Sequence, residues 1–146
     1  MNKLIKIASA IILFSIPYLI TFPIFCWFKY SLTPNLSFSL HRDVLGATVS
    51  SYSSALIAVL IVGLTFLLGI KNNNFIKLQQ YGYLLPIITL YALTFVELGI
   101  LFFAGIILIS NFKELPLPSM AAIMVVTSFM HLCLLILQLY NLSNRK

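Results

Sequence analysis

Four long runs of apolar residues occupy most of this chain of 146 residues. They cover about 7–28, 44–70, 83–110 and 119–142, and each is at least 22 residues long. A helix rises about 1.5 Å per residue, so about 20 residues cross a hydrocarbon core of about 30 Å. The runs therefore predict an all-α polytopic membrane protein with four transmembrane helices, built as a single integral membrane domain over residues 1–146.

The composition supports a lipid environment. Charged residues make up 8% of the chain and hydrophobic residues 61%, whereas a soluble domain carries about 25% charged residues. So few charged side chains cannot form the surface of a globular protein in water. Membrane lipid is therefore the first expected partner. We predict a multi-pass protein of the bacterial inner membrane with no soluble catalytic or nucleic-acid-binding domain.

The first apolar run follows Lys3 and Lys6 and superficially looks like a signal peptide. Its 22 residues exceed the length of a signal-peptide core, and no A-x-A cleavage site follows. We expect an uncleaved first span.

The positions of the cations predict the orientation, because cytoplasmic loops carry an excess of Lys and Arg. One side of the four spans would hold six cations and no acid: Lys3, Lys6, Lys71, Lys77, Arg145 and Lys146. The other side would hold three cations and two acids: Lys29, Arg42, Lys113, Asp43 and Glu114. Both termini are therefore expected in the cytoplasm, and the formal charge of +6 needs no direct nucleic-acid contact to explain it.

Enzyme motifs are missing from the sequence. It contains no Gly-rich phosphate loop, no H-E-x-x-H, no G-x-S-x-G and no pair of cysteines at zinc spacing. We expect neither an enzyme nor a cofactor nor a metal site.

Glu97 is the one acid inside a predicted span, thirteen residues from Ser110, and His131 lies twelve residues from Ser119. The short connection makes these two spans antiparallel neighbours, so both side chains lie near the membrane midplane. A carboxylate there costs several kcal/mol unless it is paired or hydrated. A hydrogen bond to His131 or a water-filled interior would stabilise it.

Further polar residues follow the same helix faces. Thr94 lies one turn from Glu97, and Thr127, His131 and Gln138 fall along one stripe of the last span. One interpretation is a buried bond that fixes helix packing. The other is a conduction or gating role for Glu97, His131, Thr94, Thr127 and Gln138, since intramembrane ionisable residues are functional by default.

Small residues recur every four positions in the second span, at Gly46, Ser50, Ser54 and Ala58. Such a row lets helix backbones approach closely, within the chain or between subunits. Alternatively, Ser50, Ser51 and Ser54 line a hydrated outer vestibule.

The string His41-Arg42-Asp43 precedes this row. Asp43 is expected to cap the second span, with Arg42 as its ion partner. The alternative is that all three residues form a charged ring at the outer mouth of an oligomer, where it would influence ion selectivity.

Three strings of residues resemble the RexB family, the membrane components of exclusion systems of the phage lambda RexA–RexB type. They are SFSLHRD at 37–43, FVELG at 95–99 and QLYNL at 138–142, with matching residues around them over about half of the chain. The resemblance implies a prophage-encoded inner-membrane protein of four helices. It also implies a cytoplasmic DNA-associated sensor, RexA, as the partner, and an ion channel that depolarises the host when another phage infects.

We therefore expect a gated channel for monovalent ions that acts in superinfection exclusion, or abortive infection. Four helices normally fill their own interior, so a pore would need a homo-oligomer. The alternatives are a non-conducting membrane binding protein of the immunity type and a holin-like pore.

Overall fold

The computed structural model describes residues 3–33, 41–69, 84–110 and 116–144. They form four long helices: α1 (Lys3–Trp27), α2 (Arg42–Gly69), α4 (Leu84–Ile109) and α5 (Leu117–Asn144). A π-helical turn, η1 (Phe28–Leu32), continues α1. Each of the four is long and apolar enough to cross a membrane, and no strand occurs in these ranges. The predicted all-α fold with four membrane helices is confirmed.

The helices begin and end within about one turn of the predicted spans. One local prediction was wrong: α2 begins at Arg42, so Asp43 lies inside its first turn and does not cap it. His41 precedes the helix, and its carbonyl accepts a hydrogen bond from the amide of Leu45 over 3.0 Å. The Asp43 carboxylate still faces the positive end of the helix dipole.

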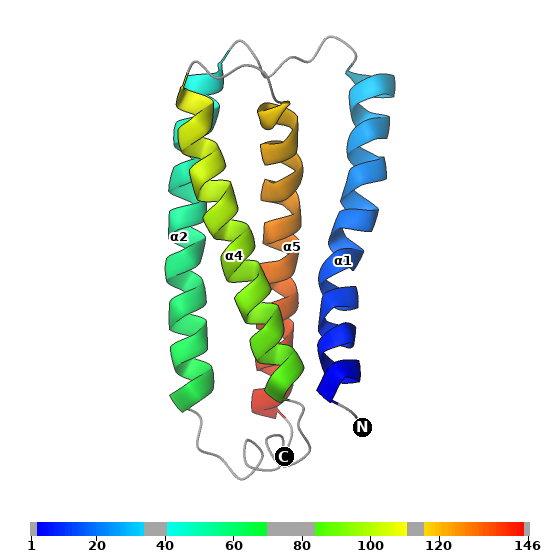
Figure 1. The fold of residues 1–146 in the computed structure, drawn as a ribbon, viewed down its shortest axis with the longest axis vertical. Helices are drawn as coiled ribbons and strands as arrows, with labels where there is room; N and C mark the ends of the chain where they lie inside the picture. The colour runs from blue at the N-terminus through cyan, green and yellow to red at the C-terminus, as the bar shows by residue number, and fades with distance from the viewer. Residues whose placement is uncertain (1–2, 34–40, 70–83, 111–115, 145–146) are drawn as a thin grey trace.

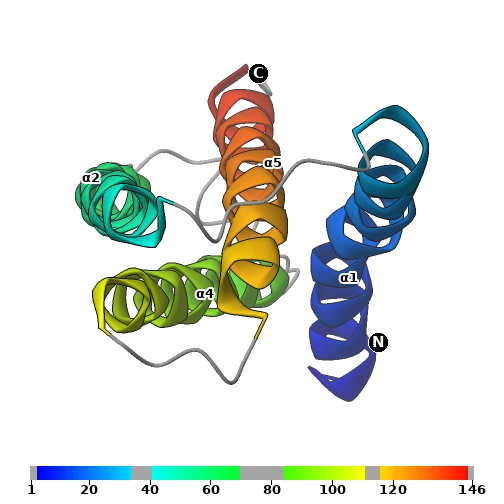
Figure 2. The same ribbon diagram turned by 90° about the horizontal axis from the view of Figure 1, so that it is seen from above.

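The four helices run side by side along the long axis (Figure 1). Seen from above, α1 and α2 lie on opposite sides of the bundle, with α4 and α5 between them (Figure 2). The start of α1 and the end of α5 lie at the same end of the bundle (Figure 1). The starts of α2 and α5 lie at the other end, together with the end of α4.

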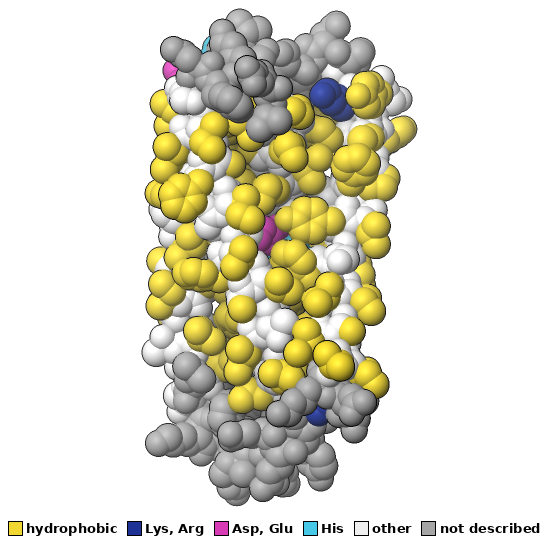
Figure 3. All heavy atoms as spheres, viewed as in Figure 1, with side chains coloured by type: hydrophobic (Ala, Val, Ile, Leu, Met, Phe, Trp, Pro, Cys, Tyr) yellow, Lys and Arg dark blue, Asp and Glu magenta, His cyan; other side chains and the backbone are white. Residues whose placement is uncertain are grey.

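Large apolar side chains point outward from every helix. Ile12 of α1, Val62 of α2, Phe103 of α4 and Leu137 of α5 are each more than half exposed, and hydrophobic side chains cover the face seen in Figure 3. Water would disfavour this surface strongly, whereas hydrocarbon does not. The inside is also apolar, with fully buried leucines at Leu67, Leu90, Leu98, Leu101, Leu108 and Leu135.

Helices α2 and α4 cross in close backbone contact at Gly46 and Gly105. A Cβ atom on Gly46 would lie 2.5 Å from the carbonyl oxygen of Gly105, and one on Gly105 would lie 2.8 Å from that of Gly46. Next to this crossing, the Ser50 hydroxyl donates to the carbonyl of Phe102 over 3.2 Å. Only residues without a side chain fit at the crossing.

Replacing Gly105 by Ala is therefore expected to lower the free energy of unfolding by about 1–3 kcal/mol, because the added methyl group overpacks a backbone contact. Gly99→Ala is the matched control on the same helix, since no atom lies within 4 Å of a Cβ there. Denaturant titration in detergent micelles measures both variants. Equal stabilities for the two would contradict the close crossing.

Candidate functional site

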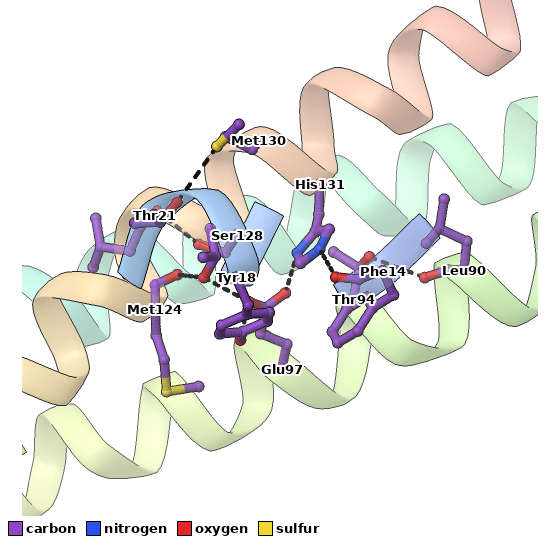
Figure 4. Close-up of polar contacts among 12 residues, drawn as sticks. Phe14, Tyr18, Thr21, Leu90, Thr94, Glu97, Met124, Ser128, Met130 and His131 are labelled. Carbon is purple, nitrogen blue, oxygen red and sulfur yellow. Dashed lines mark hydrogen bonds and ion pairs between the residues drawn. The ribbon is translucent and has the colours of Figure 1, made fainter. Parts of the chain in front are cut away.

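A polar cluster lies midway along the bundle, centred on the carboxylate of Glu97 (Figure 4). Oε2 of Glu97 is 2.7 Å from Nδ1 of His131 on α5. Its other oxygen, Oε1, accepts hydrogen bonds from the hydroxyls of Tyr18 on α1, over 2.5 Å, and Thr127 on α5, over 3.0 Å. The carboxylate thus joins three helices. The shared depth predicted for Glu97 and His131 is confirmed by their contact.

The second ring nitrogen of His131 fixes the tautomer. Nε2 is 2.8 Å from the backbone carbonyl oxygen of Phe14 on α1. A carbonyl can only accept, so Nε2 carries a hydrogen and donates it. The imidazole also stacks on the ring of Phe14, with centroids 4.2 Å apart and an interplanar angle of 4°.

The contact between Oε2 and Nδ1 therefore contains one proton. With that proton on His131 the two residues form an ion pair, and with the proton on Glu97 they form a neutral hydrogen bond. In both cases the pair has no net charge, and each of its nitrogen and oxygen atoms has a partner. This satisfies the requirement that a buried charge be paired and hydrogen-bonded.

The pair is almost completely shielded. Glu97 is 4% exposed, and His131 and Thr127 are fully buried. A small acidic patch shows at mid-height on the face seen in Figure 3, surrounded by hydrophobic side chains. The cluster is thus a polar centre inside an apolar bundle.

Pro17 lies in α1 about one turn after Phe14. A proline inside a helix removes one backbone donor and displaces the carbonyls of the preceding turn. Phe14 belongs to that turn, and Pro17 itself is fully buried within α1. The donor missing at Pro17 would have bonded to the carbonyl of Leu13, and the next carbonyl of that turn, that of Phe14, accepts from His131.

Tyr18 and the carbonyl of Phe14 were not predicted from the sequence. One signal was available for Tyr18: it lies in the middle of a span, whereas Tyr30 and Tyr140 lie near span ends, where tyrosine is common. A tyrosine hydroxyl in the middle of a membrane requires a partner. A backbone carbonyl carries no residue-specific signal at all.

Two of the predicted stripe residues lie outside the hydrogen-bonded cluster. Thr94 is fully buried, and its hydroxyl donates to the carbonyl of Leu90 on its own helix over 2.9 Å. Gln138 lies about 10 Å further along α5, at about 1.5 Å per residue. Its Oε1 is buried and has no hydrogen-bond partner among the described residues.

The small residues of α2 separate into two groups. Gly46 and Ser50 lie against α4, whereas Ser54 and Ala58 are exposed on the outside of the bundle. Ser51 is also exposed, and its carbonyl accepts a hydrogen bond from the Ser54 hydroxyl over 3.2 Å.

The string His41-Arg42-Asp43 lies at the start of α2, at the end of the bundle opposite the start of α1 (Figure 1). His41 and Asp43 are exposed, and Arg42 is partly buried. The structure therefore separates these residues from the cluster around Glu97.

A second polar contact joins α2 to α5. The Tyr52 hydroxyl lies 3.1 Å from the carbonyl oxygen of Val125, to which it donates, and 3.3 Å from the hydroxyl of Ser128. It does not involve α1. Within the described ranges, no group of three His, Cys, Asp or Glu residues lies close enough to hold a metal ion.

Comparison with known proteins gives one family. The model of the RexB family, described as a membrane-anchored ion channel and Abi component, matches residues 8–146. The protein rexB of Escherichia phage lambda is 42% identical over 141 residues, which cover 97% of each chain. No solved structure matches the chain.

Glu97→Ala is expected to lower the free energy of unfolding by about 3–5 kcal/mol, because it leaves the imidazole and two hydroxyls without a partner. Glu97→Gln keeps an acceptor for the hydroxyls of Tyr18 and Thr127 and a donor toward Nδ1. Its loss of unfolding free energy should therefore be clearly smaller. Denaturant titration in micelles measures both.

Asp43→Ala is the control, an acid removed from the exposed start of α2, with an expected loss of at most about 1 kcal/mol. A Glu97→Ala variant as stable as this control would refute a structural part for the pair.

Proposed function

The chain belongs to the RexB family, and from that membership we propose that it is an ion channel that depolarises its host when another phage infects. The family is described as a membrane-anchored ion channel and Abi component, not as an enzyme. With four helices able to cross the membrane, the chain is a multi-pass inner-membrane protein and a component of an abortive-infection system. Depolarisation, the trigger and the residues involved are the proposal.

The observation that carries the proposal is the hydrogen-bonded pair of Glu97 and His131 in the middle of the membrane helices. Ionisable residues at this depth are rare and mark ion or proton pathways. We propose that Glu97, His131 and Thr127 form the gate, with Thr94 and Gln138 along the conduction path.

The conducting unit is proposed to be a homo-oligomer. Fully buried leucines fill the interior along α4 and α5, so we propose that monovalent ions pass between copies. The exposed serines Ser51 and Ser54 would then face the outer vestibule of this pore, with Ser50 beside them.

The charged residues fit the same arrangement. We propose that His41, Arg42 and Asp43 form a ring at the outer mouth, because they lie at the end of the bundle opposite the termini. The excess of cations at the other end would place both termini in the cytoplasm. A RexA-like sensor that binds DNA would reach the channel from that side.

Recording from the purified protein in planar bilayers tests the channel directly. Discrete single-channel currents carried by monovalent ions are expected, together with loss of membrane potential in cells that express the protein. Absence of currents, with and without a RexA-like partner, would refute conduction. Passage of fluorescent dextrans would instead indicate a holin-like pore.

Conduction is also expected to depend on pH, because Glu97 and His131 share a single proton. A second proton on the pair would leave a charged His131 beside a neutral Glu97 and weaken their contact, so acidification should raise the current. Tyr18 from α1 is the remaining titratable side chain bonded to this pair.

His131→Gln should abolish this pH response. His41→Gln tests the other histidine of the chain, which lies exposed at the start of α2 in the proposed outer ring; loss of the pH response in that variant instead would place the pH sensor at the mouth. Retention of the wild-type response in the His131→Gln channel would show that the pair does not sense pH.

A further inference from the structure

We propose that α1 is the gating helix, and that the Tyr18 hydroxyl and the Phe14 carbonyl form a latch that holds it closed over the pair of Glu97 and His131. The inference rests on the proposed channel function and assigns its moving part. Neither latch group belongs to the three strings at 37–43, 95–99 and 138–142 that resemble the RexB family, and both come from α1.

Three polar contacts of α1 with the other helices lie at this one place, and a fourth joins Lys29 of η1 to the hydroxyl of Ser119 on α5 over 3.4 Å. The Phe14 carbonyl accepts from His131, and Tyr18 donates to Glu97. One turn further, the Thr21 hydroxyl lies 3.7 Å from the sulfur of Met130. These three groups lie within two turns of α1 and face the middle of α4 and α5 (Figure 4).

The other three helices hold together without α1. The crossing at Gly46 and Gly105 joins α2 to α4 by backbone contact. Tyr52 joins α2 to α5, and buried leucines such as Leu98 and Leu135 fill the space between α4 and α5. None of these contacts is lost when α1 moves, so α2, α4 and α5 form a body that α1 can leave.

An apolar groove runs beside α1 at the level of the latch. It has a volume of about 530 Å³, and Phe14, Tyr18 and Phe22 line it together with Ile123 of α5. The outer side of α1 carries exposed apolar side chains, among them Ile12 and Leu19. Movement of α1 at this level therefore exchanges lipid, groove and packing contacts and ruptures the latch, while Lys29 of η1 can stay bonded to Ser119 at the other end.

Rupture of the latch changes the pair at once. Glu97 Oε1 loses the Tyr18 hydroxyl, and His131 Nε2 loses its acceptor. Glu97, Thr127 and His131 then face the side that α1 has left, where water or another copy of the chain can contact them. The latch thus couples the position of one helix to the hydration of the polar cluster.

The test compares two tyrosines that each bond across helices. Tyr18→Phe removes the latch hydroxyl, whereas Tyr52→Phe removes a hydroxyl that joins α2 to α5 and leaves α1 untouched. In planar bilayers, Tyr18→Phe should raise the open probability about tenfold, as expected for loss of a bond to a charged group. Tyr52→Phe should leave it within about twofold of the wild type. An unchanged Tyr18→Phe channel, or an equal rise in both variants, would overturn the latch.

A second measurement is independent of conduction. Met130→Cys places a thiol opposite α1 in a chain whose native cysteines, Cys26 and Cys133, are replaced by Ala. Its reaction rate with N-ethylmaleimide should rise several-fold when Tyr18→Phe is added and stay constant when Tyr52→Phe is added.

The two measurements separate the two proposals. A rise in the thiol reaction rate that occurs only with Tyr18→Phe, in a protein that carries no current, would support the latch and refute the channel. Equal thiol rates in the two tyrosine variants, alongside normal wild-type currents, would keep the channel and refute the latch.

Discussion

A carboxyl group in the middle of a membrane must find partners inside the protein, and this requirement organises the bundle. Glu97 satisfies it with one imidazole and two hydroxyls. These partners come from α1 and α5, so the acid on α4 brings three helices to one point. Apolar packing alone distinguishes poorly between rotations of such helices, because lipid tails are as apolar as leucine. The hydrogen bonds at Glu97 give α1, α4 and α5 a common register.

Two kinds of interaction therefore hold the helices together. The crossing of α2 and α4 depends on close backbone approach at Gly46 and Gly105, and dispersion contacts of that kind are numerous and short-ranged. The polar attachment of α1 depends on a few directed bonds that end on Glu97 and His131, beside apolar packing that includes the buried Ala10 and Pro17. A helix held by few directed bonds can be released by breaking them. This contrast is the physical basis for assigning movement to α1 and rigidity to the other three helices.

The sequence predicts the parts of this structure that depend on the length of the apolar runs and on the depth of a residue within its span. The spans follow from apolar runs, and the meeting of Glu97 with His131 follows from a short antiparallel connection. The position of α1 does not follow, because no short connection ties α1 to α4 or α5 and its key acceptor is a backbone carbonyl. The small residues of α2 recur every four positions, and this spacing drifts by about 40° per step on a helix of 3.6 residues per turn. Gly46 and Ser50 therefore meet α4, while Ser54 and Ala58 turn outward.

The proton count at the pair limits how the cluster can be opened. Because Nε2 of His131 must donate to Phe14, and Oε1 of Glu97 accepts two hydroxyls, one proton is shared between Oε2 and Nδ1. A pair without net charge gives the membrane potential almost nothing to act on, since that work scales with charge moved. A signal must then arrive as a proton or as a displacement of α1. Both act on the pair of Glu97 and His131. An added proton weakens the contact between Oε2 and Nδ1, and a shift of α1 removes the Phe14 carbonyl that fixes the tautomer of His131.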